Sequence, residues 1–158
     1  MTRTASVRAR PPAAPALSLS VQYASNARDL PTRAQVRRWV RAALDADANV
    51  NVRFVEAIEG RALNAEYRGK DYATNVLTFV YDDEHPRAGD IVLCVPVVRQ
   101  EAEAQHKPLT AHFAHLVVHG TLHMQGYDHE RAADAKAMER RETKILAGFG
   151  IADPYVDR

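Results

Sequence analysis

HGTLHMQGYDH, residues 119–129, is the stretch around which the rest of the chain is organised. Its three histidines, His119, His123 and His129, are separated by four and six positions. Imidazoles four residues apart leave the same face of a helix. Gly126 is predicted to end that helix, because glycine adopts backbone angles that other residues avoid, and the turn would bring His129 back. Three imidazole nitrogens can then converge on one cation with a position left open, as in catalytic rather than structural zinc sites.

A neighbouring histidine, His115, offers a rival ligand set, since His115, His119 and His123 are spaced by four throughout. The outer two would lie about 12 Å apart along the helix, whereas zinc–nitrogen bonds are only ~2.0–2.1 Å long. The third ligand is therefore expected beyond the break, at His129. His115 is then a candidate for the shell around the ligands, for a substrate-facing role or for simple packing.

Two further residues near the metal helix have open roles. Asp128 could orient a ligand imidazole or cap the following helix, and we favour neither. His112 is expected to be an exposed helix residue.

The spacing of the three histidines equals that of the H-E-x-x-H-x-x-G-x-x-H zinc proteases. The glutamate that activates water in those enzymes is replaced here by Gly120. Peptide hydrolysis by the usual route is therefore not expected.

Length and composition indicate one ordinary globular domain. The chain has 158 residues, a formal net charge of +1 and one cysteine, Cys94. The near-neutral charge identifies no partner, so a nucleic-acid substrate would need a local basic patch. The lone cysteine excludes an internal disulfide and fits a reducing compartment, and we expect a cytoplasmic location. No apolar run is long enough to span a membrane.

Residues 1–16 are rich in arginine and proline and lack apolar periodicity, so we expect a disordered tail followed by one domain over residues 17–158. A transit peptide and an RNA-touching arm are the alternatives. Patterning then predicts strands at residues 17–23, 50–54, 75–81 and 91–95, with Gly89-Asp90 as the turn before the last. Helices are expected from 31, over 59–67, and from 96, 108 and 130. The order favours an α+β fold, a small mixed four-stranded sheet with packed helices.

The arginines of the first predicted helix, Arg33, Arg37, Arg38 and Arg41, lie largely off its apolar face. A solvated surface is the simpler interpretation, and an RNA-facing surface is the alternative.

Three separated motifs resemble those of one family. HGTLHMQGYDH resembles the signature of the YbeY family, bacterial rRNA-maturation endoribonucleases once regarded as predicted metalloproteases. Residues 63–77 fit its LN-x-x-YR-x-KD-x-x-TNVL run, and residues 89–91 fit its GDI strand entry. Small departures, such as Ala73 where proline is frequent, remove no metal ligand.

The resemblance implies a zincin-like metal helix and one Zn²⁺ per chain, held by His119, His123 and His129. It implies Arg68 as the functional arginine, in a single-strand-specific endoribonuclease of 16S rRNA 3′-end maturation and ribosome quality control. Independently, an arginine fork suits the charge that develops on phosphoryl oxygens. Arg61, Lys70 and Tyr67 are RNA-contact candidates. Small-subunit rRNA is the implied partner, with ribosomal proteins or an assembly GTPase as further candidates.

Two other functions share the histidine triad. One is a metal-dependent peptidase or amidase, which lacks its glutamate here. The other is a non-catalytic ribosome assembly factor with a structural zinc. The sequence does not indicate an oligomeric state.

Overall fold

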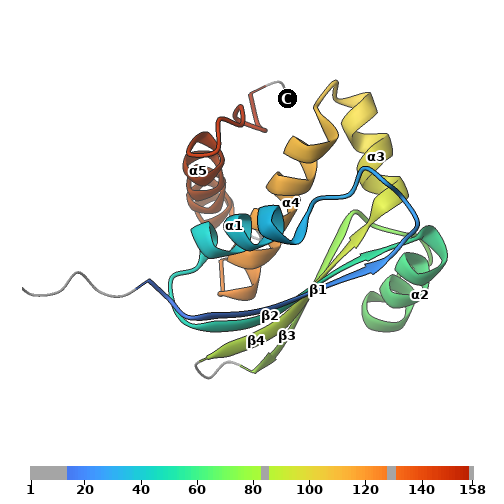
Figure 1. Cartoon of the computed structure of the whole chain (residues 1–158), viewed down its shortest axis with the longest axis horizontal. Coiled ribbons are helices and arrows are strands. Elements are labelled where there is room, and N and C mark those ends of the chain that lie inside the picture. Colours follow the sequence, from blue (N-terminus) through green and yellow to red (C-terminus); the bar gives the residue numbers. More distant parts are fainter. Residues whose placement is uncertain (1–13, 83–85, 128–130, 157–158) are drawn as a thin grey trace, which may run out of the picture.

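A four-stranded sheet in the order β1-β2-β4-β3 forms the base of the molecule (Figure 1). The computed structural model describes residues 14–82, 86–127 and 131–156. Strands β1 (Leu17–Ala24), β2 (Ala48–Val55) and β4 (Arg87–Cys94) are parallel, and β3 (Val76–Asp82) is antiparallel at the edge. The predicted α+β fold with a small mixed sheet is confirmed.

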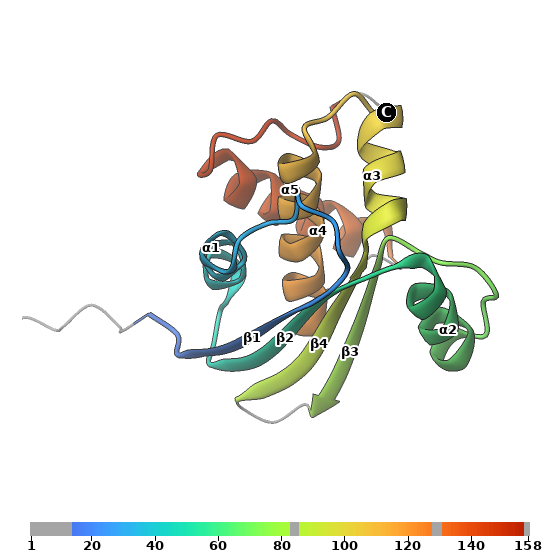
Figure 2. The ribbon, with the colours of Figure 1, turned by 45° about the vertical axis from the view of Figure 1, so that its right-hand side comes forward.

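Five helices pack around the sheet in the described part of the chain. Helices α1 (Arg33–Ala43), α4 (Leu109–Met124) and α5 (Ala132–Ala147) gather on one side, and α2 (Ala57–Arg68) lies against the other face (Figure 2). Helix α3 (Val95–Ala104) follows β4 directly and packs beside α4. None of the described helices is long and apolar enough to cross a membrane.

Alternation along the strands produces two apolar layers. One face of β2 buries Val50, Val52 and Phe54 in the main core, under α1 and α4. The other face contributes Val55 to a smaller cluster beneath α2, which also holds Cys94. Cys94 is fully buried, as expected of a small core residue, and burial raises the pKa of its thiol.

The predicted turn at Gly89-Asp90 is wrong, because both residues lie inside β4. Gly89 pairs with Val50 on one side and with Val80 on the other. A Cβ at Gly89 would lie 2.6 Å from the Phe79 carbonyl oxygen and 2.7 Å from the sulfur of Met124. The glycine is therefore needed for close packing of the strand against its neighbour and α4, not for a reversal of the chain.

Candidate metal centre

Helix α4 presents His115, His119 and His123 along one half-buried stripe. The ring centroids of His115 and His119 are 6.2 Å apart, and those of His119 and His123 are 6.4 Å apart with the rings nearly parallel at 6°. The predicted shared face is confirmed. The neighbouring positions of the helix, among them Leu116, Val118 and Leu122, are buried in the core and fix its rotation.

Glu142 of α5 is the carboxylate that holds this stripe, and it is fully buried. Its carboxylate accepts hydrogen bonds from His119 Nδ1, from His115 Nε2 at 3.3 Å and from the Tyr155 hydroxyl. Burial alone would raise the pKa of Glu142, but the hydrogen bonds from His115 and His119 outweigh it and lower the pKa to about 2. The carboxylate is therefore ionised at neutral pH, and it requires a proton on His119 Nδ1.

His123 is oriented by the turn that follows the helix. The helix ends at Met124, and Gly126 adopts a φ of +99°, a left-handed value that favours glycine. The turn brings the Tyr127 carbonyl back to within 3.1 Å of His123 Nδ1, which donates a hydrogen bond to it. The predicted break at Gly126 is confirmed.

Both imidazoles are thus set in the same tautomer. With the proton on Nδ1, the lone pair lies on Nε2, the nitrogen that can bind a metal. Histidine ligands in metal sites commonly donate their other ring N–H to a carboxylate or a backbone carbonyl. Glu142 for His119 and the Tyr127 carbonyl for His123 are groups of these two kinds, so the donor set fits a divalent cation such as zinc.

A second arrangement also meets the distance criterion for a metal. One nitrogen each of His115 and His119 and one oxygen of Glu142 lie within 4.8 Å of one another. This group is closed, however, because the Glu142 carboxylate is fully buried and accepts three hydrogen bonds. An ion there would displace those hydrogen bonds, so a site built on Nε2 of His119 and His123 is the better catalytic candidate.

The predicted third ligand His129 and the candidate Asp128 lie outside the described residues. His115 hydrogen-bonds Glu142, and Glu142 in turn hydrogen-bonds His119. His115 is therefore linked to a candidate ligand through the Glu142 carboxylate. The pKa of His115 is lowered, chiefly by burial.

The expectation that His112 is exposed is wrong. It is only 4% exposed, and its Nε2 lies 2.9 Å from Glu101 Oε1 on α3. Glu101 also accepts a hydrogen bond from the Asn75 side chain at 3.0 Å. His112 faces α3 because α4 packs against that helix, a tertiary contact that sequence periodicity does not show.

The packing around Gly120 explains why no glutamate occupies position 120. A Cβ at this position would lie 2.9 Å from Ile91 Cγ2, because α4 rests directly on β4 there. Position 120 therefore faces the sheet and has no room for a glutamate side chain.

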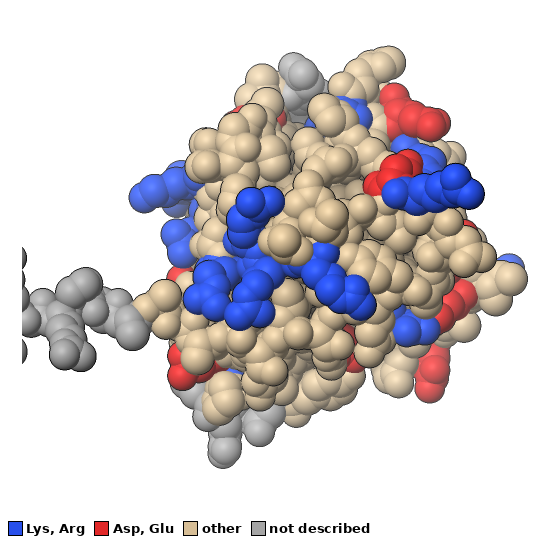
Figure 3. Space-filling model, viewed as in Figure 1, with Lys and Arg blue, Asp and Glu red and all other residues tan. Residues whose placement is uncertain are grey.

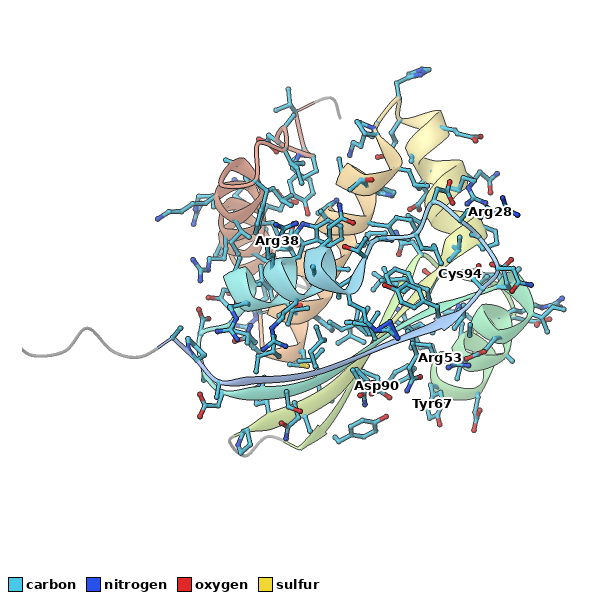
Figure 4. All side chains as sticks on the ribbon, viewed as in Figure 1. Arg28, Arg38, Arg53, Tyr67, Asp90 and Cys94 are labelled. Carbon is cyan, nitrogen blue, oxygen red and sulfur yellow. The ribbon has the colours of Figure 1, made fainter. Side chains whose placement is uncertain are left out.

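Arg68 lies exposed in the last turn of α2. Asp71, a possible partner, instead forms a two-pronged ion pair with Arg61, at 2.8 and 2.9 Å. Arg68 forms no ion pair with any residue that the structure describes. Tyr67, one residue earlier, is 60% exposed (Figure 4). Its ring packs edge-on against that of Phe79.

The other RNA-contact candidates are also exposed. Arg61 is occupied by Asp71, and Lys70 lies just beyond the end of α2. The structure thus gathers Arg61, Tyr67, Arg68 and Lys70 on α2 or just after its end.

Comparison with known proteins identifies the family. The family model described as "Endoribonuclease YbeY" matches residues 21–150. The chain belongs to the YbeY family. A relative named endoribonuclease YbeY from Thiobacillus denitrificans is 58% identical over 144 residues, which cover 90% of this chain and 98% of the relative. Another of that name, from Aromatoleum aromaticum, is 58% identical over 142 residues, covering 88% and 92%.

A solved structure shares the YbeY-like fold. The solution structure of TM1509 from Thermotoga maritima superposes with a TM-score of 0.62 at 26% identity, over 89% of this chain and 96% of that one.

Glu142 is the site residue that sequence reasoning missed. A signal was present, since Glu142 falls between Met138 and the pair Ile145 and Leu146 on the apolar stripe of α5. A carboxylate on a buried stripe requires hydrogen-bonding or charged partners, and the histidines of α4 supply them.

Proposed function

We propose that this protein is a zinc-dependent, single-strand-specific endoribonuclease that acts in 3′-end maturation of 16S rRNA and in ribosome quality control. The observation that carries the proposal is the matched pair His119 and His123, each with Nδ1 engaged and its lone pair on Nε2. The relatives' name, endoribonuclease, supports RNA as the substrate.

His119, His123 and His129 would hold one zinc ion per chain. A bound zinc ion supplies Lewis-acid chemistry, activating water and polarising a phosphoryl oxygen. The protein's own contribution is orientation: Glu142 fixes the His119 ring, and the Tyr127 carbonyl fixes the His123 ring. Rings already held in place lose little freedom when a ligand binds.

Arg68 is proposed to stabilise the negative charge that develops on the phosphoryl group. A planar guanidinium binds phosphate with two parallel hydrogen bonds, which suits this role better than a lysine. That no described carboxylate pairs with Arg68 supports the role, since an arginine already in an ion pair would have to break it. Tyr67 offers an exposed aromatic face for base stacking beside it.

Peptide hydrolysis has less support. The contact between position 120 and Ile91 leaves no space for the general base of the zinc proteases. We place the proposed activity in the cytoplasm, with small-subunit rRNA as the main partner and ribosomal proteins or an assembly GTPase as further partners.

RNA cleavage by purified zinc-loaded protein tests the proposal. Arg68→Ala should lower the rate of cleavage of single-stranded RNA by about 10² or more, the scale of losing one charge-stabilising group. Arg28→Ala is the matched control, because Arg28 is also exposed and forms no ion pair among the described residues. Equal rates for wild type and Arg68→Ala would remove Arg68 from the mechanism. Absence of cleavage by the wild-type protein would exclude the nuclease and favour the assembly-factor alternative.

A further inference from the structure

Helix α1 carries an unusual concentration of positive charge for a nearly neutral chain. Its sequence, RAQVRRWVRAA, contains four arginines and no carboxylate, whereas the whole chain has a net charge of +1. Lysine and arginine side chains gather over α1 on the face shown in Figure 3 and continue towards α5. We call Arg37, Arg38 and Arg41 the α1 arginine surface.

The three arginines are exposed and form no ion pair with any described residue. This separates them from four described arginines that pair with carboxylates. Those pairs are Arg53–Glu59, Arg61–Asp71, Arg99–Asp29 and Arg141–Asp45. Arg33, at the start of α1, donates to the Val21 carbonyl and lies 5.0 Å from the Tyr23 ring, so it is held against the protein. The α1 arginine surface is therefore a set of cations without internal counter-charges.

The helix beneath these arginines is firmly fixed. Its opposite face buries Val36, Trp39 and Val40 in the main core. Its first turn is closed by a capping box, in which Gln35 N donates to the Thr32 side chain at 3.1 Å and Thr32 N donates to the Gln35 side chain at 2.9 Å. A rigid support holds the guanidinium groups at helical spacing, with neighbours about 5–6 Å apart at their Cβ atoms.

One residue of the arginine surface, Arg38, lines a hollow that extends to His115 at one end of the histidine stripe. The hollow has a volume of about 1340 Å³, and its walls include Arg38 of α1, His112 and His115 of α4 and Tyr155. His115 and Tyr155 both hydrogen-bond Glu142, which holds His119. Figure 4 shows Arg38 on the side of α1 towards α4 and α5. A ligand lying over α1 at Arg38 would therefore approach the His115 end of the histidine stripe.

We propose that the α1 arginine surface binds the phosphate backbone of an extended single-stranded RNA outside the cleavage site. A row of cations along successive helix turns matches a repeating polyanion better than a single small anion, which would need convergent donors. Guanidinium groups bind phosphate bidentately, and a backbone contact carries no sequence requirement. This inference rests on the proposed nuclease function for the identity of the polyanion.

Binding to an RNA that is not cut tests the surface separately from catalysis. The probe is a fluorescent 2′-O-methyl oligouridine of about 20 nucleotides, enough to span several phosphate contacts, with its integrity checked on a gel. The variant is Arg37→Gln combined with Arg41→Gln. Arg28→Glu is the control, because it changes the net charge by the same two units at a distant exposed arginine (Figure 4). Affinity is measured by fluorescence anisotropy across a salt series.

The double variant should bind about tenfold more weakly at low salt, and its log–log salt slope should fall by about 1.4, two contacts at ~0.7 each for a single strand. In cleavage of natural RNA it should raise KM and leave kcat unchanged. The Arg28→Glu variant should keep the wild-type affinity and slope.

Three outcomes would overturn the inference: unchanged binding by the double variant, equal weakening in both variants, or competition by polyglutamate as effective as that by unlabelled RNA. The last would assign the surface to an acidic protein. If the wild type binds the oligouridine but cuts no RNA, the proposed nuclease function fails, while the binding comparison still decides the role of the surface.

Discussion

Replacing Glu142 with glutamine tests how His119 is oriented as a proposed metal ligand. The side chain keeps its shape but loses its charge, and one carboxylate oxygen becomes an NH₂ group. Glu142 accepts from His119 Nδ1, His115 Nε2 and the Tyr155 hydroxyl, so at least one of these donors would face another donor. The carboxylate would no longer hold the proton on His119 Nδ1, so the imidazole ring could rotate or change its tautomer.

The expected loss can be estimated from other metal sites. Removing a group that orients a ligand histidine commonly costs 10–100-fold in metal affinity, or about 1.4–2.7 kcal/mol. Because Glu142 is fully buried, the free energy of unfolding of the metal-free protein should also fall, by about 2 kcal/mol for the impaired charged hydrogen bonds. Both effects come from a residue that is not itself a proposed ligand.

The assay is zinc competition with a fluorescent chelator, together with zinc stoichiometry by elemental analysis. Glu103→Gln is the control, since it makes the same chemical change at an exposed position of α3. Zinc affinity of Glu142→Gln within twofold of wild type would refute the orienting role. If the wild type bound two zinc ions per chain and Glu142→Gln bound one, the result would show instead that His115, His119 and Glu142 form a separate metal site.

Three further predictions follow from the packing and the hydrogen bonds. Gly120→Ala should lower the free energy of unfolding by about 1–3 kcal/mol in a urea titration, because its Cβ would press on Ile91 from 2.9 Å; unchanged stability would show that α4 can shift without cost. Tyr155→Phe should cost about 1 kcal/mol through the lost hydroxyl donor to Glu142, measured in the same way, and no change would mean that the C-terminal segment does not support the site. Burial would raise the pKa of Glu101, but hydrogen bonds from neighbouring side chains outweigh burial and lower this pKa in the folded protein. The ionised carboxylate therefore stabilises the fold above its unfolded pKa, and this stabilisation disappears as the pH falls through the lower folded pKa. The difference in free energy of unfolding between wild type and Glu101→Gln should narrow on acidification, and a constant difference would contradict this.

Local patterns sufficed for most elements of the fold. Alternation predicted the first two strands, and an apolar, β-branched run predicted the third. The spacing of Val36, Trp39 and Val40 predicted the buried face of α1. The failure at Gly89-Asp90 has a tertiary cause. Glycine is common in turns, which suggested a turn at Gly89. In the structure the missing side chain of Gly89 instead allows Phe79 and Met124 to approach the strand closely.

The site was predictable where one helix determines it, and not where two elements meet. Spacing placed His119 and His123 on one face and Gly126 at the helix end, and the structure agrees. The roles of Glu142 and His112 depend on α5 and α3 packing against α4. Their partners are 23 and 11 residues away in sequence, so no local pattern pairs them.

His123 is proposed to bind a metal on which RNA cleavage depends. Zinc content and cleavage of single-stranded RNA should be measured together on wild type, His123→Ala and His106→Asn. His106 is an exposed histidine with a φ of 53°, which asparagine tolerates, so that variant controls for loss of an imidazole. We expect one zinc per chain and RNA cleavage in wild type and His106→Asn, and loss of both in His123→Ala. Full zinc content and undiminished cleavage in His123→Ala would contradict it.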